Sequence, residues 1–486
     1  MTSTQSVPRA SGTVALMPRR GARLDDAYAG LRRAQRAEPV IPYAVRREAL
    51  ESLKRVLTRY ALQMITAANA DFGCRSELTT RLGDLFTMQS ELDYMLRALP
   101  RWSRPERRRT ELLFRFGRGH VEHQPLGVVA VIAPWNYPFR LTLGPLAAAI
   151  AAGNRVLVKP SELAPRCAEL IETMVGEALS PDHAQVLLGG SELSEALCRL
   201  PVDHIFFTGS SAVGRAVLES ASANLTPVTL ELGGKCPAII HPEYPLGHAV
   251  AHVLAGKLFN AGQTCMAPDH LWVQRTELDR TLAELRLACQ RLYPRLADNE
   301  DYTSIINRKH YERLVSLVSD AERLGAKVEV LNPANEVLPA SSRKLGPTLV
   351  WNVSERMALA KEEVFGPVLP IHVYDTIDQL LIELREKPAP LALYYFDRDR
   401  VRCRNVVAGT TSGGVCLNDV VLHSIQNDLP FGGVGASGMG KYHAVEGFQC
   451  FSHARAVFRQ GRLNGGALLM PEYTRFARAL IGWLSR

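Results

Sequence analysis

Residues 128–158, VVAVIAPWNYPFRLTLGPLAAAIAAGNRVLV, decide the fold class. A β-branched run, Val128 to Ile132, is followed by an apolar segment of helical length, 141–152, and then by a second short run, Arg155 to Val158. A strand, a helix and a strand at this spacing predict a unit whose two strands are parallel. The stretch therefore indicates an α/β protein.

The same alternation continues toward the C-terminus. Further strands are expected at 186–188, 204–207 and 228–230, with helices at 164–178, 193–200 and 212–221. A second series of strands and helices starts at Pro237 and runs to about residue 422. We therefore predict two doubly wound parallel-sheet domains, which bind ligands at the carboxyl ends of their strands.

The segments outside the two series predict the rest of the organisation. Residues 31–102 show helical periodicity, and residues 114–123 alternate about a glycine-containing turn, which predicts a projecting hairpin near 113–123. We expect a loose N-terminal arm over 1–25, a first domain over 26–231, a second domain over 232–425, a return segment over 426–462 and a tail over 463–486.

The composition narrows the class of protein. Of the 486 residues, 47% are hydrophobic and 22% are charged, as in globular proteins and unlike disordered or fibrous ones. The apolar runs are shorter than the roughly 18 residues of a membrane span. Lysine and arginine exceed aspartate and glutamate by 57 − 49 = 8, but the densest basic run, 101–109, lacks repeated aromatic residues. We therefore expect neither a membrane span nor a nucleic-acid partner.

Cysteine and histidine spacing argues against metal sites and disulfides. The nine cysteines form no CxxC pair, and His248 and His252, at i and i+4, have no third ligand near them in the sequence. The apolar piece 13–17 is too short for the core of a signal peptide. We expect a cytoplasmic protein without a metal.

One cysteine lies in a setting that suits a nucleophile. Cys265 follows a helix-forming segment in the stretch 259–268, FNAGQTCMAP, whose glycine and polar residues predict an exposed loop. Free thiols titrate near about 8.5, so a small thiolate fraction exists at neutral pH and is strongly nucleophilic. From the spacing alone, an inert buried cysteine remains the alternative.

Two polar side chains follow predicted strands. Asn136, in the segment PWNYPF (134–139), is an uncharged amide that can donate to an oxyanion or cap the next helix. Glu231 ends the apolar run from Val228, where it can serve as a general base or form a salt bridge to Lys235. A third segment, HIFFTGSSAVGR (204–215), passes from a strand through a glycine turn into a helix, where a dinucleotide pyrophosphate can bind.

These segments, together with KPSE (159–162), EEVFGP (362–367) and LPFGGVGASG (429–438), resemble the NAD(P)-dependent aldehyde dehydrogenase family over roughly residues 30–460. The region from Asn418 to His453 is similar to the class 3 and coniferyl aldehyde dehydrogenase branch. One position departs from that branch, because Ala444 stands where glycine is usual. This substitution puts the local backbone conformation in question.

The resemblance implies an NAD-dependent oxidation of an aldehyde, with NADP as a possible cofactor, and hydrophobic or aromatic substrates such as coniferyl aldehyde. Cys265 would be the nucleophile, Glu231 the general base and Asn136 an oxyanion donor. It further implies a homodimer or homotetramer built partly through the hairpin. The implied cofactor-binding residues are Trp135, Lys159, Glu162, Gly209, Ser210, Gly214, Glu363 and Phe365.

Two alternatives accompany this interpretation. A CoA-acylating dehydrogenase would pass the thioester to CoA, but that branch lacks the base that Glu231 matches. A catalytically idle structural or binding relative is the other alternative, and the presence of Cys265, Glu231 and Asn136 together argues against it.

The C-terminal tail predicts an amphipathic helix. Apolar residues recur at i, i+3, i+4, i+7 and i+8, and arginines lie off that stripe: Phe476, Ala479, Leu480, Trp483 and Leu484 against Arg475, Arg478 and Arg486. We expect the apolar face to pack on the enzyme body or on a partner subunit. Weak docking on an anionic membrane is the alternative.

Overall fold

The computed structural model describes residues 24–111, 114–462, 466 and 470–486. Most of the expected N-terminal arm lies outside these residues, and its last two residues, Leu24 and Asp25, already belong to helix α1. The helical region expected over 31–102 consists of α1 (Leu24–Ala37), α2 (Tyr43–Arg59), α3 (Ala61–Phe72), α4 (Glu77–Thr80), the π-helical turn η1 (Arg81–Phe86) and α5 (Thr87–Trp102).

The first sheet has six strands in the order β15-β7-β6-β3-β4-β5, and all but β15 are parallel. Their bounds are β3 (Val128–Ile132), β4 (Arg155–Lys159), β5 (Ala184–Val186), β6 (His204–Thr208), β7 (Val228–Glu231) and β15 (Gly438–Met439). The helices between them are α6 (Arg140–Ala152), α7 (Pro165–Ala178), α8 (Ser191–Cys198) and α9 (Ser211–Ser222). The predicted doubly wound sheet is thus confirmed, with β5 starting and ending two residues before the expected strand.

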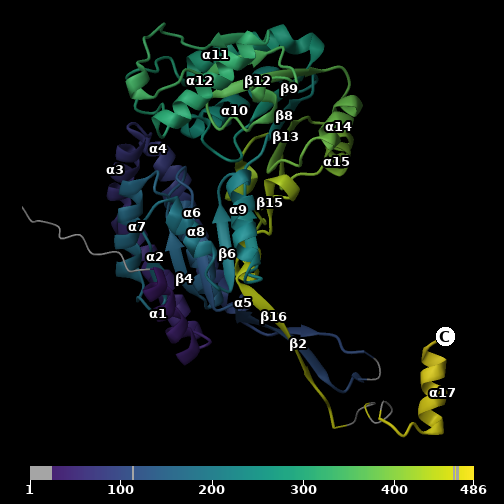
Figure 1. The fold of residues 1–486 in the computed structure, drawn as a ribbon. Helices are drawn as coiled ribbons and strands as arrows, with labels where there is room; N and C mark the ends of the chain where they lie inside the picture. The colour runs from purple at the N-terminus through teal and green to yellow at the C-terminus, as the bar shows by residue number, and fades with distance from the viewer. Residues whose placement is uncertain (1–23, 112–113, 463–465, 467–469) are drawn as a thin grey trace, which may run out of the picture.

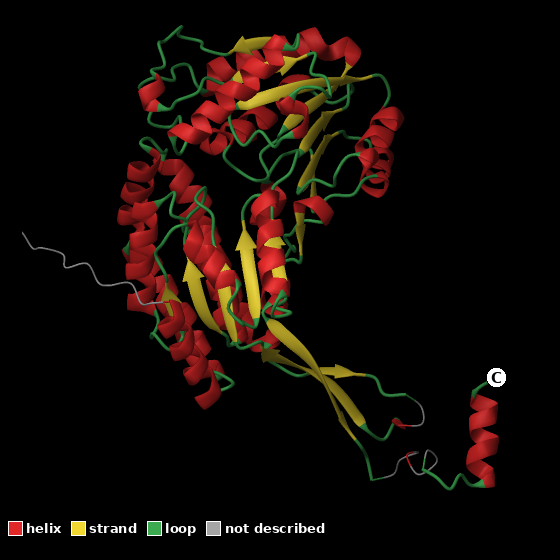
Figure 2. Cartoon of the chain, in the orientation of Figure 1, coloured by secondary structure: helices red, strands yellow, loops and turns green. Residues whose placement is uncertain are grey.

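Strand β3 shows why this sheet is covered on both faces. All five of its residues are buried. Val129 and Val131 join the apolar cluster that contains α6, while Val128, Ala130 and Ile132 join the cluster that contains α1. Since successive side chains point to opposite faces of a strand, a continuous apolar run requires helices on both sides. Figure 2 shows these two helical layers.

The second sheet has seven strands in the order β10-β11-β12-β9-β8-β13-β14, and only β10 is antiparallel to its neighbour. Its strands are β8 (Pro237–Ile240), β9 (His270–Gln274), β10 (Lys327–Val330), β11 (Thr348–Trp351), β12 (Val368–Tyr374), β13 (Ala392–Phe396) and β14 (Gly414–Leu417). The main helices are α10 (Leu246–Leu258), α11 (Leu278–Leu292), α12 (Arg308–Arg323), α13 (Ala358–Lys361), α14 (Ile377–Glu386) and α15 (Arg400–Gly409). Figure 1 shows this half of the molecule above the first sheet.

A third, three-stranded sheet projects from the body (Figure 1). It contains β1 (Glu106–Arg108), β2 (Arg118–Pro125) and β16 (Ser452–Arg459), all antiparallel. The reversal lies between β1 and β2 and includes Gly117, whose N–H donates to the Phe114 carbonyl at 2.7 Å, so a glycine-containing turn is present. Gly119 is not part of this turn, because it lies within β2 and pairs with Arg108 and Phe458.

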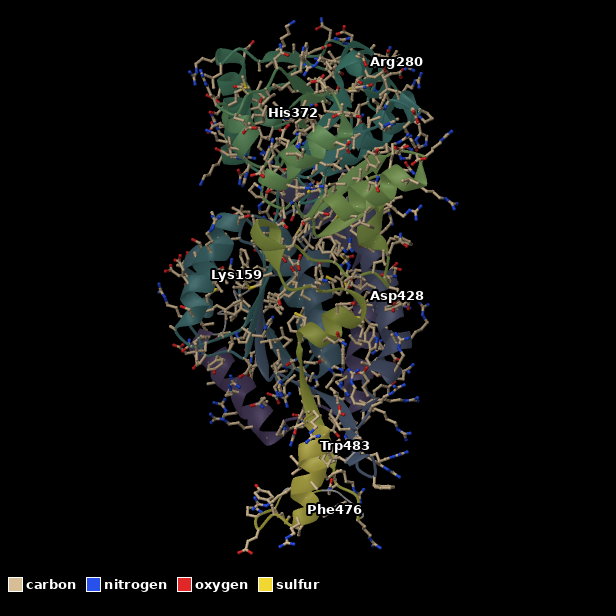
Figure 3. All side chains as sticks on the ribbon, turned by 90° about the vertical axis from the view of Figure 1, so that its right-hand side faces the viewer. Lys159, Arg280, His372, Asp428, Phe476 and Trp483 are labelled. Atoms are coloured by element: carbon tan, nitrogen blue, oxygen red, sulfur yellow. The ribbon has the colours of Figure 1, made fainter. Side chains whose placement is uncertain are left out.

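The C-terminal helix α17 (Arg475–Leu484) confirms the predicted helix but does not pack on the body of its own chain. Phe476 is 67% exposed and Trp483 is 70% exposed, and Ala477 is the buried residue of the helix. Figure 3 shows both aromatic side chains at the end of the projecting segment. Of the two expected packing partners, the enzyme body is therefore wrong, and a partner subunit stays a prediction. Among the described residues, no helix is both long and apolar enough to span a membrane.

The position with alanine in place of glycine lies at the start of α16 (Ala444–Cys450). His443 and Ala444 have φ values of 72° and 48°, so both adopt the left-handed region that favours glycine. Both are buried, at 4% exposure each. The chain therefore retains a backbone suited to glycine, and Ala444 carries local strain.

Candidate active site

Two cavities meet at Cys265 and Glu231, which line both of them. The larger cavity, of about 880 Å³, extends between the carboxyl ends of the first sheet and the second half of the molecule. The smaller cavity, of about 550 Å³, lies on the other side of the two residues. Three more residues, Leu141, Thr208 and Leu232, border both cavities.

The loop that carries Cys265 is held by buried polar contacts. After α10 the chain turns through Asn260, Ala261 and Gly262, whose φ values are 54°, 51° and 74°. A Cβ at Gly262 would lie 2.3 Å from the carbonyl oxygen of Gly366, so only glycine fits there. The fully buried Gln263 donates from Nε2 to the Ser304 carbonyl at 3.1 Å and accepts at Oε1 from the Ile306 N–H at 2.9 Å. These contacts fix where the thiol lies.

The Cys265 thiol faces both cavities but is strongly desolvated. Burial, followed by the carboxylates of Glu363 and Glu231, raises the pKa of this thiol to about 12, although the charge of Arg140 acts in the opposite direction. The thiol form therefore predominates at neutral pH in this structure. Cys265 lines both cavities, which is the position that a nucleophile requires, and its role stays a prediction.

Glu231 ends β7 and is 3% exposed. Neither carboxylate oxygen has a hydrogen-bond partner among the described residues, and burial raises the pKa of this carboxyl well above its usual range. The salt bridge to Lys235 is not formed, because Lys235 Nζ instead contacts Asp269 Oδ2 at 2.6 Å. A desolvated, unpaired carboxyl at a cavity wall is typical of a group that exchanges protons with a ligand.

Asn136 lies on the wall of the larger cavity and is 4% exposed. Its Nδ2 donates to the Gln263 carbonyl at 3.1 Å, which leaves the second amide hydrogen for another acceptor. The N-terminal residue before α6 makes no side-chain cap, so the alternative of Asn136 as a helix cap is not realised. Asn136 therefore joins the loop of Cys265 at the site.

The glycine turn at the start of α9 opens into the larger cavity. Gly209 and Ser210 line it, and the Ser210 hydroxyl caps α9 by accepting from the Val213 N–H at 3.4 Å. Gly214 lies inside α9, where a Cβ would approach Leu232 to 2.8 Å, so this glycine serves the packing of the helix. A helix N-terminus with free N–H groups is suited to a phosphate.

Three further predicted residues line the same cavity. The ring of Trp135 contacts that of Phe365 edge to face, at 5.5 Å between centroids. Burial and the charge of Asp269 raise the pKa of Glu363 to about 8, although a hydrogen bond from Gly234 opposes the shift. These side chains come from the end of β3 and from the loop before β12, so the two halves of the molecule meet here.

Lys159 and Glu162 lie at the carboxyl end of β4, beyond the residues that border the larger cavity. Lys159 is 1% exposed and its Nζ contacts Glu162 Oε2 in an ion pair, and Figure 3 labels its position. Burial opposes ionisation of Glu162, but the hydrogen bond from Lys159 lowers its pKa, so the carboxylate is charged at neutral pH.

Together these features fit a dinucleotide. The larger cavity has the volume of a ligand site, and the N-terminus of α9 opens into it. The carboxyl of Glu363 lies on its wall, and that of Glu162 lies near it at the carboxyl end of β4. Ribose hydroxyls can donate hydrogen bonds to such groups. Gly214 and Glu162 contribute through packing and charge and do not border the cavity. Among the residues that the structure describes, no group of three or more histidine, cysteine, aspartate or glutamate side chains is placed to hold a metal ion.

Sequence reasoning missed the residues that support this site. Asp269, 3% exposed, accepts from Lys235 Nζ and from the Val364 N–H at 2.8 Å, which ties the loop of Glu363 to the strand end after Glu231. The charge of Lys235 and the hydrogen bond from His270 lower the pKa of Asp269 despite its burial. The sequence signal that could have identified Asp269 is an acidic residue directly before a mainly apolar strand, β9.

It also missed the lining of the smaller cavity. Arg140, Tyr137 and His443 border it, with the Tyr137 hydroxyl 2.7 Å from Thr264 Oγ1. The remaining wall is mainly apolar and includes Leu82, Phe86, Phe259, Met266 and Phe431. No sequence pattern joins these positions, because they come from separate elements.

Comparison with known proteins adds to this geometry. The family model described as "Aldehyde dehydrogenase family" matches residues 7–457. A probable coniferyl aldehyde dehydrogenase of Pseudomonas aeruginosa is 40% identical over 458 residues, which cover 94% of this chain and 95% of the relative. The coniferyl aldehyde dehydrogenase of Pseudomonas sp. strain HR199 is 42% identical, with 86% of each chain covered. The aldehyde dehydrogenase family 3 member A2 of Pongo abelii is 36% identical, with 91% of this chain and 89% of the relative covered.

Solved structures agree. The substrate-bound state of Staphylococcus aureus AldH has a TM-score of 0.89 and 32% identity, and the alignment covers 95% of this chain and all of the other. An indole-3-acetaldehyde dehydrogenase in complex with NAD⁺ has a TM-score of 0.81 and 25% identity, with 90% and 88% of the two chains covered.

Proposed function

Because the chain belongs to the aldehyde dehydrogenase family and is an NAD(P)-dependent aldehyde oxidoreductase, we propose that it oxidises a hydrophobic or aromatic aldehyde to the carboxylic acid through Cys265. The observation that carries this proposal is the position of Cys265 and Glu231 on the walls of both cavities. The coniferyl aldehyde dehydrogenases among the relatives suggest this class of substrate.

In the first step the Cys265 sulfur adds to the carbonyl carbon of an aldehyde in the smaller cavity. The developing oxyanion accepts hydrogen bonds from the free Nδ2 hydrogen of Asn136 and from the Cys265 backbone N–H. Since the pKa of the thiol is raised to about 12, the thiol proton must leave as the carbon–sulfur bond forms, and the unpaired carboxylate of Glu231 is the acceptor that borders the same space.

The dinucleotide, when bound, supplies the hydride acceptor. The N-terminus of α9 would bind its phosphates, and Trp135, Glu363 and Phe365 would hold it along the wall beside Cys265. Oxidation leaves an acyl group on the Cys265 sulfur as a thioester. Glu231 first passes the thiol proton to solvent. Its carboxylate then takes a proton from water as that water attacks the thioester, and the carboxylic acid is released as the carbon–sulfur bond breaks and the sulfur regains a proton from Glu231.

The choice between cofactors rests on Glu162. The ion pair with Lys159 keeps its carboxylate charged, and a charged carboxylate accepts from ribose hydroxyls but repels a 2′-phosphate. We therefore expect NAD over NADP. The variant Glu162→Gln should raise the NADP-to-NAD ratio of kcat/KM by about tenfold; an unchanged ratio contradicts the assignment.

A CoA-acylating activity and a catalytically idle relative remain the competing proposals. The carboxyl of Glu231 argues against the first, since a base that activates water serves hydrolysis and not transfer to CoA. The intact arrangement of Cys265, Glu231 and Asn136 argues against the second.

A cytoplasmic homodimer or homotetramer completes the proposal. The support is the projecting sheet β1-β2-β16, a surface that a second copy can extend, and the exposed apolar face of α17. We propose that this face packs on a partner subunit, with weak contact to an anionic membrane as the alternative. Truncation after Gly466 followed by sedimentation with anionic liposomes and by size measurement separates the two.

The experiment that tests the chemistry uses Glu231→Gln. This variant should release about one equivalent of NADH per active site in a rapid burst and then stall, because the amide cannot accept a proton from water. In the unmodified enzyme the hydrolytic step should speed up as pH rises, since Glu231 must lose its proton to act as a base. Full steady-state turnover of the variant contradicts the role of Glu231, and an increase of NADH that needs CoA supports acyl transfer instead.

A further inference from the structure

A cation lies on the mainly apolar wall of the smaller cavity, which also carries the carboxyls of Glu231 and Asp419. Arg140 is the first residue of α6, and its half-buried side chain borders this cavity together with apolar residues such as Phe86, Phe259 and Phe431. A guanidinium group removed from water needs acceptors for its five N–H hydrogens. The contacts of Arg140 therefore decide what it can bind.

The structure satisfies only part of this donor capacity. Arg140 Nη2 donates to the Ser424 carbonyl at 3.1 Å, in the short 3-10 helix η6 (Leu422–Ile425), and lies 3.5 Å from His443 Nε2. The Nε atom is buried and has no hydrogen-bond partner among the described residues. Within the same described residues, no carboxylate oxygen lies within 4 Å of the guanidinium nitrogens. Arg140 thus retains unused donors.

The charged groups packed around Arg140 do not form a pair with it. Asp84, which accepts from the Arg140 backbone N–H, pairs with Arg75 at 3.0 Å, and both side chains are fully buried. Glu91, on α5, has an oxygen without a partner, and burial raises the pKa of this carboxyl, which favours its neutral form. Burial also lowers the pKa of His443 well below its usual range, so that ring is neutral and accepts from Arg140. Among the described residues, Arg140 therefore keeps an unpaired positive charge on a wall that it shares with Glu231 and with Asp419, whose Oδ1 lies 3.0 Å from His252 Nδ1.

We propose that Arg140 binds a carboxylate at the end of the aldehyde substrate that is remote from its carbonyl group, and so determines the substrate class. The inference rests on the proposed function, because it assigns the smaller cavity to the aldehyde. Cys265 lies where the two cavities meet, and the cavity opens toward exposed residues such as Leu82 and Phe86, which are 51% and 57% exposed. An aromatic ring along these apolar walls would carry a substituent past Arg140.

The physical basis is the strength of a charge-assisted hydrogen bond in a desolvated site. A guanidinium offers a planar pair of donors that matches a carboxylate, and a site built around such donors discriminates against an analogue that lacks the acceptor. A methyl group at the same position would accept no hydrogen bond from the guanidinium donors that the structure leaves unused. We expect the discrimination to be about ten- to a hundredfold.

The test compares aldehydes that differ only at the remote group. Steady-state kcat/KM is measured with NAD for 4-carboxybenzaldehyde against 4-methylbenzaldehyde, and for 4-carboxycinnamaldehyde against 4-methylcinnamaldehyde, which place the group at two distances from the carbonyl. The expected result is a carboxylate-to-methyl ratio of about 10 or more in at least one pair.

Three variants decide which residue sets the ratio. Arg140→Met should lower the ratio about ten- to a hundredfold, and Arg140→Lys should keep an intermediate ratio, because an ammonium retains the charge without the planar fork. Arg97→Met removes an exposed arginine of α5 and should leave the ratio unchanged. Since each ratio is measured within one protein, a partial loss of folded enzyme cancels.

Every other outcome overturns the inference. A ratio that is the same in Arg140→Met and in the unmodified enzyme shows that Arg140 does not bind the remote group. Equal losses with both members of each pair show that Arg140 acts on the thiol or on the fold. If no aldehyde is oxidised although the protein is folded, the proposed function fails together with the inference, whereas turnover with unchanged ratios overturns the inference alone.

Discussion

The two cavities that meet at Cys265 are built by different means. The larger one is bordered by a helix N-terminus, by loops at strand ends and by many charged side chains, and the ion pair of Lys235 with Asp269 ties its parts together. The smaller one is bordered mainly by apolar side chains from separate elements, with Arg140 as an exception. The larger cavity thus depends on backbone and charge, which suit one constant ligand, and the smaller on side-chain identity, which suits a particular substrate.

The variant Cys265→Ser should abolish oxidation whichever aldehyde or cofactor is bound, because Cys265 lines both cavities. A hydroxyl is a much weaker nucleophile than a thiol, so NADH formation should fall at least about a thousandfold with every aldehyde and with either cofactor. The matched control is Cys74→Ser, a change of a half-buried cysteine outside both cavities, which should retain activity. Steady-state NADH absorbance is the measurement, and comparable rates for the two variants contradict the role of Cys265.

The pH dependence of Cys265 alkylation tests the desolvation of this thiol, which lies where the two cavities meet. Burial raises the pKa of Cys265 to about 12, so below that pH the thiolate fraction grows about tenfold for each pH unit. In enzyme without cofactor, the rate of alkylation by iodoacetamide should therefore rise about a hundredfold between pH 7 and pH 9. Mass spectrometry of the Cys265 peptide follows the reaction. A plateau that begins below pH 8 means that the thiol is already ionised.

The variant Asp269→Asn should weaken the larger cavity alone. Removing the carboxylate leaves Lys235 without its ion-pair partner, and we expect the free energy of unfolding to fall by about 2 kcal/mol. The KM for NAD should rise more than the KM for the aldehyde, because Asp269 also holds the loop of Glu363. Denaturant unfolding and the two KM values test this. An equal rise of both KM values would show that Asp269 does not act on the larger cavity alone.

The smallest effect is expected beside the smaller cavity. Ala444 adopts a φ of 48°, and Ala444→Gly should relieve this strain and raise the free energy of unfolding by about 0.5 kcal/mol. Ala168→Gly, in the interior of α7, is the control and should lower stability by about 1 kcal/mol. Thermal unfolding compares the two variants, and equal destabilisation would show that Ala444 is not strained.

Elements with a strong local pattern were predictable. The strand Val128–Ile132 and the helix that follows have the apolar residue types and the lengths that buried elements require. The structure contains both, with bounds within one residue of those predicted. Strand β5 was misjudged because Leu187 and Leu188 extend the apolar pattern after the strand has ended. Gly119 misled in the opposite direction, because glycine is typical of turns but here lies within a paired strand.

In the candidate site, sequence motifs identified the residues that lie directly beside a predicted strand or helix. Cys265, Asn136 and Glu231 each stand at a loop next to a predicted element, and the fold brings them together. Arg140, Asp269 and His443 were missed because their importance comes from contacts across long sequence distances, such as that between Arg140 and Ser424. Such contacts leave no local periodicity. The orientation of α17 away from the body was unpredictable for the same reason, since an amphipathic pattern does not name its partner.

The pairing of β15 with β7 and of β16 with β2 has a consequence for how the chain is made. Both pairings join strands of the first half to segments that follow the entire second sheet. During synthesis on the ribosome the seven-stranded sheet can fold as an inserted unit, while the edge of the first sheet at β7 stays open until residues after 438 emerge. The open edge includes Glu231, so the wall between the two cavities is completed only at the end of translation.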